Sequence, residues 1–388
     1  MKERIMGRGK DRRRGVGFVA IAIALIMALA VCAGCASPSP SNERASSASV
    51  SSASASADGT RTITDALGRE VKVPAKVERV AIVQVPILST YVAYQGGTTK
   101  GLVGVSKNII GSMKGSVLMD MIPDLQNLSS DCFADGKLNM EELVKLKADV
   151  IIIPNQNAEL AENLQKAGLN AVAFNVAGDP KALYVEWLRM LEDLFDEPGK
   201  MDACIVDGEA MYQKVEKAVG DASDKPSVLT VFGYSNGNMQ VTGSGSRATF
   251  WYQYANAANA AEEINGIDGT SMEQVVAWNP DIILLPGIGQ CQYLPPDLIG
   301  NTIEGADFSA LSAVQNGKVY CNGLGSWSWF TPSVDWPLTM EWLAKVTRPD
   351  LTSDIDVVAD TKAYYKSYYN VDLSDAQMSD IFPNYAGI

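Results

Sequence analysis

The residue types that most often carry out catalysis near neutral pH are missing from this chain. Its 388 residues include no histidine, and imidazole is the commonest metal ligand and general base near pH 7. Ser-His-Asp catalysis, Cys-His catalysis and a bare zinc or manganese site built on His are therefore excluded. We find no G-x-S-x-G nucleophile elbow in a strand-turn-helix context, no Walker loop and no dinucleotide-binding loop. We expect neither an enzyme nor a protein with its own cofactor or bare metal ion.

Aromatic side chains concentrate in the second half of the sequence, where they could stack on a flat ligand. They are Tyr234, Trp251, Tyr252, Trp327, Trp329, Phe330 and Trp336. Corrins, haems and catecholates offer flat faces, although most large aromatic residues belong to hydrophobic cores. Trp327 and Trp329 alternate with Ser after a predicted strand, so we expect these two in a ligand cleft. Gly243-Ser-Gly-Ser246, after a predicted hairpin, is a weaker phosphate-loop candidate.

A pattern of elements that could position such groups occurs twice. Residues 139–154 and 271–286 align without a gap. Each has a polar cap residue, a short helix with the same apolar spacing, an Asp, four apolar residues and a Pro. A mostly β-branched run of this kind is typical of a strand buried on both faces of a parallel sheet. Two such units about 130 residues apart predict an α/β protein with two similar parallel-sheet lobes.

Local patterns predict the remaining elements. Residues 65–74 predict a hairpin with Gly68 in its turn, and residues 80–85 predict a first buried strand. Residues 180–219 are helical in pattern with a break at Pro198-Gly199, and they suit a connector between lobes. We therefore expect an N-terminal lobe over 61–179, connecting helices over 180–225 and a C-terminal lobe over 226–388.

The N-terminus has the features of an export signal. Seven Lys and Arg lie in the first fourteen residues, and residues 15–34 carry no charge. Ala33-Gly34-Cys35 matches bacterial lipoprotein signals, which are cleaved before a lipidated cysteine, although Cys32 stands where Leu is usual. We expect a signal peptide over 1–34, lipidation at Cys35 and a flexible Ser/Ala-rich tether over 35–60. An uncleaved membrane anchor or simple secretion is the alternative.

The charge balance and the length restrict the partners and the architecture. The formal net charge is −13, and residues 1–34 contribute +5, which leaves −18 on the remainder. This acidic body opposes nucleic acid or anionic lipid as its partner. A length of 388 residues with 47% apolar and 20% charged residues predicts a soluble globular body of two domains.

Four cysteines lie beyond the signal region: Cys132, Cys204, Cys291 and Cys321. None has the close C-x-x-C spacing of metal sites, so metal binding is the weaker interpretation. Cysteines of an exported protein can pair. Cys291–Cys321 is the more plausible bridge, because Cys291 follows one predicted strand and Cys321 ends the next.

Several sequence blocks in a fixed order resemble the substrate-binding proteins of iron-siderophore and cobalamin ABC importers. They are residues 64–74, Val77-Glu-Arg-Val-Ala81, the two Glu-to-Asp-(Val/Ile)-Ile blocks, residues 313–320 and Trp342-Leu-Ala-Lys345. The resemblance spans about residues 61–350. It implies two αβ lobes joined by one long, fairly rigid helix, a ligand in the cleft between them and a small closure on binding. It also implies an ABC permease and ATPase as partners, and a lipid-anchored location outside the cytoplasm. We expect a monomer.

Ligands of parallel αβ lobes lie beyond the carboxyl ends of the strands. This rule, together with the loop 242–247, selects Gln84, Ser106, Lys107, Asn155, Gln156, Tyr234, Arg247, Trp251, Trp327 and Trp329. Only Lys107 and Arg247 are basic, whereas several Arg usually hold an anionic ferric siderophore. A weakly charged chelate such as a ferric hydroxamate siderophore is therefore favoured, with a corrinoid next. Haem is possible through Tyr234, because no His is available.

The resemblance further implies that an acidic residue on each lobe docks an Arg of the permease. Glu159 or Glu162 and, on the second lobe, Asp297 or Glu304 are the nearest candidates, and we select Glu159 and Asp297. Any one of them is more often an ordinary solvated carboxylate. The main hypothesis is a lipoprotein that delivers a metal chelate to an ABC importer. An adhesion or sensor module, or an extracellular enzyme on the same scaffold, is the alternative, and a neighbouring permease and ATPase gene pair would favour import.

Overall fold

The computed structural model describes residues 58–83, 85–134, 137–235, 237–287, 291–323 and 325–382. These residues belong to one compact unit. The predicted signal peptide, Cys35, nearly all of the tether and Gln84 lie outside the described residues. Within the described ranges, no helix has the length and apolar character needed to cross a membrane.

The first sheet is fully parallel, as expected, and has the order β4-β3-β7-β8. Its strands are β3 (Val80–Ile82), β4 (Leu102–Val105), β7 (Val150–Pro154) and β8 (Ala171–Phe174). Val150 and Ile152 of β7 pack into a large cluster with α1 (Val85–Tyr94) and α6 (Pro180–Phe195). Ile151 and Ile153 pack into a second cluster with α4 (Met140–Lys145) and α5 (Ala158–Lys166). Both faces are therefore buried, which explains the uninterrupted apolar run.

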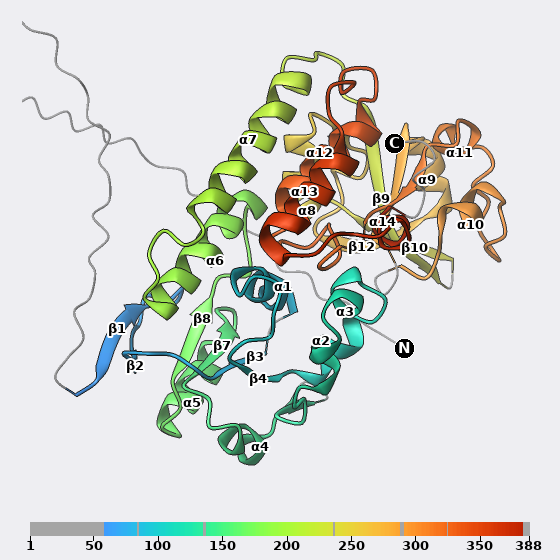
Figure 1. The fold of residues 1–388 in the computed structure, drawn as a ribbon. Coiled ribbons are helices and arrows are strands. Elements are labelled where there is room, and N and C mark those ends of the chain that lie inside the picture. The colour runs from blue at the N-terminus through green and yellow to red at the C-terminus, as the bar shows by residue number, and fades with distance from the viewer. Residues whose placement is uncertain are drawn as a thin grey trace, which may run out of the picture. The chain divides into compact units, whose positions relative to one another are not determined.

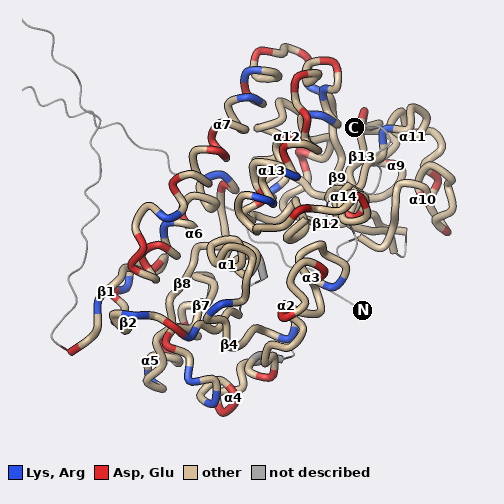
Figure 2. Tube along the Cα trace, viewed as in Figure 1, with Lys and Arg blue, Asp and Glu red and all other residues tan. Residues whose placement is uncertain are grey.

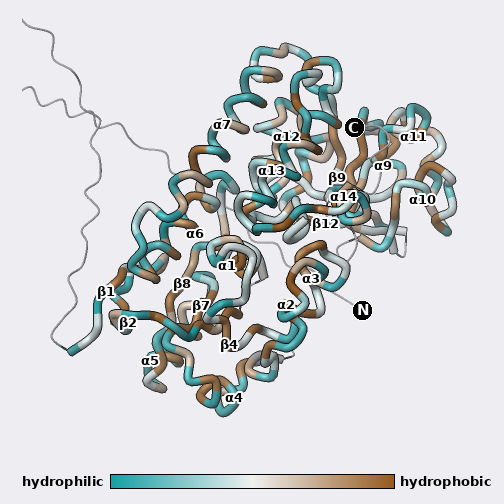
Figure 3. Tube along the Cα trace, viewed as in Figure 1, coloured by the Kyte–Doolittle hydropathy of each residue, from teal (hydrophilic) through white to brown (hydrophobic). Residues whose placement is uncertain are grey.

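The second sheet is mixed, with the order β12-β10-β9-β13-β14. Its strands are β9 (Ser227–Ser235), β10 (Asn238–Thr242), β12 (Ile267–Ser271), β13 (Ile282–Leu285) and β14 (Val319–Cys321), and β11 (Ala258–Asn259) pairs with β9. β9, β13 and β14 are parallel, whereas β10 is antiparallel to β9 and β12. The two sheets thus share a parallel part and differ in the β9–β10 hairpin. Hydrophobic residues run along β8 and β9, one strand from each sheet (Figure 3).

The two αβ copies form as predicted. They are α4 with β7, and α9 (Met272–Trp278) with β13. The Asn139 side chain accepts a hydrogen bond from the Glu142 amide, and the Ser271 side chain accepts one from the Gln274 amide, both at 3.2 Å. Each copy therefore begins with an N-cap that satisfies a free helix N–H group.

The predicted hairpin pairs β1 (Thr60–Thr64) with β2 (Glu70–Pro74), and Gly68 has a φ of +72° in its turn. The predicted break lies between α6 and α7 (Asp202–Val219), where Asp196 is left-handed and Pro198-Gly199 follow. Acidic and basic residues are interspersed along both helices (Figure 2). α7 packs against α12 (Trp336–Thr347), which lies beside α13 (Val357–Tyr369) (Figure 1). One hydrophobic cluster runs from the first sheet through these helices to Val228 and Leu284 of the second sheet.

Short elements complete the described structure. They are α2 (Lys107–Ser112), α3 (Val117–Met121), η1 (Pro123–Asn127), β5 (Phe133–Ala134), β6 (Lys137–Leu138), α8 (Arg247–Tyr254), α10 (Pro295–Ile299), α11 (Ser312–Gln315) and α14 (Asp375–Ile381).

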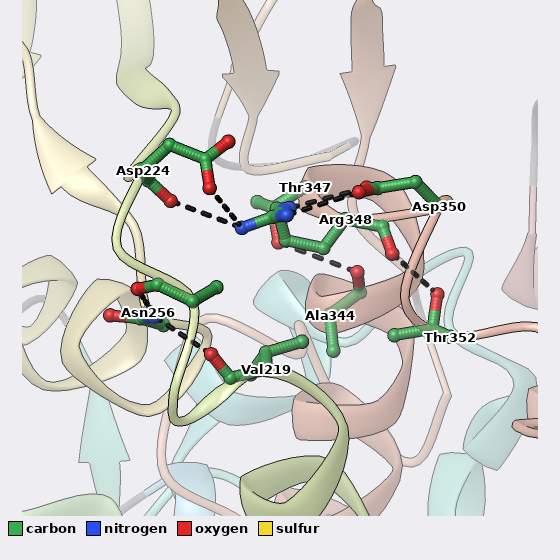
Figure 4. A network of polar contacts seen from close by, with 9 residues as sticks. Val219, Asp224, Asn256, Ala344, Thr347, Arg348, Asp350 and Thr352 are labelled. Carbon is green, nitrogen blue, oxygen red and sulfur yellow. Dashed lines mark hydrogen bonds and ion pairs between the residues drawn. The ribbon is translucent and has the colours of Figure 1, made fainter.

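The junction between α7 and β9 is held by two side chains that follow the ends of α8 and α12 (Figure 4). The Asn256 amide donates to the carbonyls of Val219 and Ala222 at 2.7 and 2.8 Å. Arg348, which is only 6% exposed, donates to the Asp224 carbonyl at 3.0 Å and pairs with Asp350 at 3.0 Å. These contacts satisfy the carbonyls at the end of α7 and fix where the chain enters the second sheet.

Candidate functional site

A pocket of about 440 Å³ lies where the loop after β8 faces the β9–β10 hairpin and α8. We call it the Arg247 pocket. Gln156 and the segment Val176–Gly178 line it from the side of the first sheet. The remaining lining residues are Thr230, Phe232, Thr242, Gly245, Ser246, Arg247, Ala248, Phe250, Trp251, Tyr252, Gly266, Ile267, Phe330 and Thr331. The pocket is therefore shared between both halves of the folded body and has the size of a small-molecule site.

The loop Gly243–Ser246 brings the chain from β10 to the start of α8. A methyl group on Gly243 would lie 1.9 Å from the Ile264 carbonyl oxygen, so only glycine fits there. The Gly243 amide donates to Gly266 and the Ser244 amide to Ile264, each at 2.7 Å. The Ser246 hydroxyl donates to the Gly243 carbonyl at 2.6 Å. The Gly/Ser composition thus serves a tightly held turn that begins a helix, where the first amide groups lack partners within the helix.

Arg247 supplies the charge of the pocket. It is the first residue of α8 and lines the pocket with its side chain exposed to solvent. The surrounding protein partly desolvates the guanidinium and so lowers its pKa. Among the described residues, no carboxylate forms an ion pair with Arg247, and no Asp or Glu lines the pocket. An unpaired guanidinium at a helix N-terminus is an arrangement that binds anions.

Hydroxyl groups and aromatic rings form another part of the wall. The hydroxyls of Thr230 and Tyr252 are hydrogen-bonded to each other, and burial raises the pKa of the Tyr252 phenol to about 12. Tyr252 therefore stays protonated near neutral pH. Trp251 packs against Phe330 with ring centroids 6.5 Å apart, and its indole donates to the Phe330 carbonyl at 3.3 Å. The pocket thus offers proton donors beside an apolar surface.

Three of the predicted ligand residues come together in this pocket: Gln156, Arg247 and Trp251. Tyr234 instead lines a neighbouring pocket of about 460 Å³, and its hydroxyl donates to the Gly305 carbonyl. The Asn155 side chain donates to Asn175 and accepts from the Val176 amide, which ties the ends of β7 and β8 together. These two side chains are occupied by the protein itself.

Two further predicted residues lie at the carboxyl end of β4. Ser106 is buried, precedes α2 and has a hydroxyl without a partner, whereas Lys107 is exposed. Neither lines the Arg247 pocket. Their place at a strand end agrees with the rule that selected them, and a contact with ligand stays a prediction.

The prediction that Trp329 contacts ligand is wrong in this structure. Trp329 is 0% exposed and lies edge-on to Trp342 and Phe382. Its indole donates to the fully buried Asp335 carboxylate at 3.1 Å. Trp327 is also buried, although 8% of its surface remains accessible. Trp329 is a core residue, because the helices α12 and α14 close over the segment after β14.

The expected Cys291–Cys321 bridge is not formed. All four cysteines beyond the signal region are buried free thiols. Cys291 and Cys321 do lie in the same hydrophobic cluster. Burial raises the pKa of Cys321 to about 12, which keeps its thiol protonated and unreactive. Among the described residues, no group of His, Cys, Asp and Glu is arranged to hold a metal ion.

The predicted docking acids lie on separate short helices. Glu159 is exposed in the first turn of α5. Asp297 accepts a hydrogen bond from the Leu294 amide at 2.8 Å and so caps α10. Permease docking through either residue stays a prediction.

Several lining residues escaped the sequence analysis. Thr230 is a polar residue inside the otherwise apolar stretch 228–232 of β9, and that departure from the pattern was an available signal. Gly266 and Ile267 reach the pocket from the start of β12, and Val176–Gly178 come from the segment before α6. No local pattern marked these positions.

Comparison with known proteins agrees with this architecture. The family model described as "Periplasmic binding protein" matches residues 82–322. The molybdate-binding protein MolA of Haemophilus influenzae is 26% identical over 330 residues, covering 80% of this chain and 91% of MolA. A periplasmic solute binding protein from Veillonella parvula is 29% identical with a TM-score of 0.76, covering 84% of this chain and 97% of that one. The structure of MolA bound to molybdate is 22% identical with a TM-score of 0.68, covering 81% and 99%. The chain belongs to the periplasmic binding protein family.

Proposed function

We propose that this protein captures an anionic solute in the Arg247 pocket and delivers it to an ABC importer from outside the cytoplasm. One observation carries the proposal: an unpaired Arg guanidinium begins α8 in a pocket that, among its described lining residues, has no carboxylate. A solvent-accessible guanidinium without a protein counter-ion is available to form charge-assisted hydrogen bonds with an anionic ligand. Residues from both sides line the pocket, so a bound solute would bridge them.

A small oxyanion is the first candidate. A relative with 26% identity carries the name molybdate-binding protein, and molybdate is a tetrahedral dianion. A guanidinium, hydroxyl groups and the amides at a helix start are the donors that bind such anions in proteins.

A metal chelate is the second candidate, and the pocket's size and aromatic wall favour it. A volume of about 440 Å³ lies in the range of sites for drug-sized molecules, and far exceeds that of a four-oxygen anion. Phe232, Phe250, Trp251 and Phe330 line it and could stack on a flat or bulky chelate. A ferric siderophore is the preferred chelate, with a corrinoid or haem next.

Calorimetric titration of the full chain with each class of ligand tests the proposal. The panel contains molybdate, tungstate, sulfate, ferric hydroxamates, ferric catecholates, haem and cobalamin, and Trp251 provides a fluorescence signal within the pocket. Saturable binding of the oxyanions supports the first candidate, and binding of chelates alone supports the second. Folded protein that binds neither class would contradict the proposal.

Substitution of Arg247 tests the site itself. Arg247→Gln should weaken anion binding by about tenfold to a hundredfold, because a hydrogen bond to a charged group is lost. Lys318→Gln is the matched control, since Lys318 is an exposed cation that precedes β14 and lies outside the pocket lining. Lys107→Gln tests the other predicted basic contact. If the Arg247 and Lys318 variants lose the same affinity, the protein attracts anions through its overall charge and not through a contact with Arg247.

The remaining functional expectations stay proposals with their own tests. Lipidation at Cys35 predicts a mass increase of the membrane-extracted protein that Cys35→Ala abolishes. Docking through Glu159 predicts that Glu159→Lys lowers uptake by the intact importer while ligand affinity stays unchanged.

A further inference from the structure

Helix α8 presents one stripe of side chains to the segment that precedes α6. Arg247, Trp251 and Tyr254 stand at positions i, i+4 and i+7 of this helix, which places them on one face. Arg247 and Trp251 line the pocket, and Val176–Gly178 line it from the side of the first sheet. Tyr254 and Asp179, which extend these two lining sets along the chain, contact each other.

The contact is a hydrogen bond between a phenol and a carboxylate. The Tyr254 hydroxyl donates to Asp179 and lies 2.7 Å from Oδ1 and 2.6 Å from Oδ2. Asp179 also accepts from the Lys181 amide at 2.9 Å and so caps α6. A hydrogen bond to a charged acceptor is roughly twice as strong as one between neutral groups. This bond therefore joins the α8 side of the pocket to the first-sheet side, directly beside the lining residues.

Both ends of the bond are held by further contacts. The Tyr254 ring lies edge-on to Tyr212 and Trp336, with ring centroids 5.3 and 5.9 Å apart. On the first-sheet side, the Trp187 indole donates to the Asn175 carbonyl at 2.5 Å, directly before the lining segment. The bond therefore connects two well-packed parts of the molecule and restricts the distance between them.

From this geometry we infer that Tyr254 is a positioning residue, whose bond to Asp179 holds Arg247 at a set distance from Val176–Gly178 before ligand enters. The inference rests on the proposed function where it concerns affinity, because the ligand is expected to contact both sides of the pocket. Tyr254 is not among the residues that line the pocket, so it acts through Arg247 and Trp251. Without the bond, the two sides separate part of the time. The apparent affinity then falls by the fraction of molecules that keep the binding geometry.

A distance measurement on the ligand-free chain tests the positioning role without any ligand. Spin labels at Glu162→Cys and Glu262→Cys report the spacing of the two sides, because both positions are exposed and the cysteines of the described ranges are buried. The full chain carries Cys32→Ser and Cys35→Ser so that only these sites react. Electron–electron resonance should give one narrow distance distribution, which Tyr254→Phe broadens. An unchanged distribution would overturn the inference.

A second Tyr–Asp bond in the molecule provides the matched control. The Tyr368 hydroxyl donates to the Asp207 carboxylate at 2.5 Å and joins α13 to α7, and neither residue lines the pocket. Tyr368→Phe should leave the distance distribution unchanged, and thermal unfolding without ligand shows that each variant is folded. If both Tyr variants broaden the distribution equally, the loss of any such bond loosens the protein and the specific role of Tyr254 is refuted.

Calorimetric titration with molybdate and with a ferric hydroxamate tests the effect on affinity. Tyr254→Phe should weaken the binding of whichever probe the original protein binds by about tenfold, as expected if about one molecule in ten keeps the geometry. Asp179→Asn retains an acceptor for Tyr254 and for the Lys181 amide, so it should bind nearly as the original protein does. Unchanged affinity in folded Tyr254→Phe would overturn the positioning role.

A double variant shows whether the two residues act through one bond. Tyr254→Phe combined with Asp179→Ala should lose no more affinity than Asp179→Ala alone, because the same bond is already absent. Losses that add would show that each residue acts separately and would overturn the inference. If the original protein binds neither probe, that result counts against the proposed function, and the distance measurement still decides whether Tyr254 sets the spacing.

Discussion

The two αβ copies use the same local contacts in sheets that are otherwise different. The Asp149 carboxylate accepts hydrogen bonds from the amides of Glu78 and Arg79, both at 2.8 Å, just before β3. The Asp281 carboxylate accepts from the amide and the hydroxyl of Ser227 at 2.8 and 2.9 Å, at the first residue of β9. Asp149, which directly precedes β7, therefore fixes the start of the paired strand β3. In the same way, Asp281, which directly precedes β13, fixes the start of the paired strand β9.

The copies differ in the segment after that first strand. β3 leads directly into α1, whereas β9 turns back into β10 and reaches α8 through the loop Gly243–Ser246. This departure supplies Thr242 and Arg247 to the pocket. The repeated unit thus builds the sheets, and the segment without a counterpart in the first sheet supplies Thr242, Gly245 and Ser246 to the pocket and leads into Arg247.

The largest loss of stability should come from disrupting the turn Gly243–Ser246, which has no counterpart in the first sheet. Gly243→Ala places a methyl group 1.9 Å from the Ile264 carbonyl oxygen, and the free energy of unfolding should fall by about 3 kcal/mol as the backbone shifts. Urea denaturation measures this change. Gly233→Ala in β9 is the control, since a methyl group there meets no atom within 4 Å. If both variants lower the free energy of unfolding by similar amounts, the turn is not closely packed against Ile264.

We expect a pH-dependent change in stability, of intermediate size, that arises from Glu341 in the second half of the molecule. Near the first sheet, the buried Arg61 side chain contacts neutral groups, because it donates to the backbone carbonyls of Asp193 and Leu194 at the end of α6. On the other side, Lys214 of α7 lies 3.2 Å from Glu341 and 2.7 Å from Asp360. Glu341 is 0% exposed, and burial, with the charge of Asp360, raises its pKa to about 8.

The sign of the effect follows from proton uptake. The folded protein keeps a proton on Glu341 that the unfolded chain releases above a pKa of 4.5, so stability falls as the pH rises from about 4.5 to 8. Glu341→Gln should flatten this dependence and raise the free energy of unfolding at pH 8 on the order of 2 kcal/mol. Denaturation from pH 5 to 9 measures it. A variant that keeps the original slope would assign the pH dependence to other groups.

The smallest effects should come from the shared contacts. Asp149→Ala and Asp281→Ala each remove an acceptor of two hydrogen bonds, and each should cost about 1 kcal/mol. Because the two residues serve different sheets, the losses in the double variant should add to within about 0.5 kcal/mol. A clear difference between the two single variants would show that the copies are alike in sequence and geometry but not in energy.

Much of the fold could be predicted because its signals are local. The caps at Asn139 and Ser271, the turn at Gly68 and the break at Pro198-Gly199 each depend on a few neighbouring residues. The strand-end rule selected Gln156 and the loop before α8 drew attention to Arg247, and both residues line the Arg247 pocket, although their contact with ligand stays a prediction. These successes rest on backbone preferences that hold wherever the segment lies.

The sequence by itself determined the two αβ units, the helices on either side of Pro198-Gly199 and the absence of histidine side chains, because composition and short-range periodicity express these properties. Only the tertiary structure decided which candidates face a pocket. Trp329 and Trp251 look alike in sequence, yet Trp329 is enclosed by Trp342, Phe382 and Asp335, whereas Trp251 borders the Arg247 pocket. The exposure of a side chain depends on segments far away in the chain, and no local pattern contains that information.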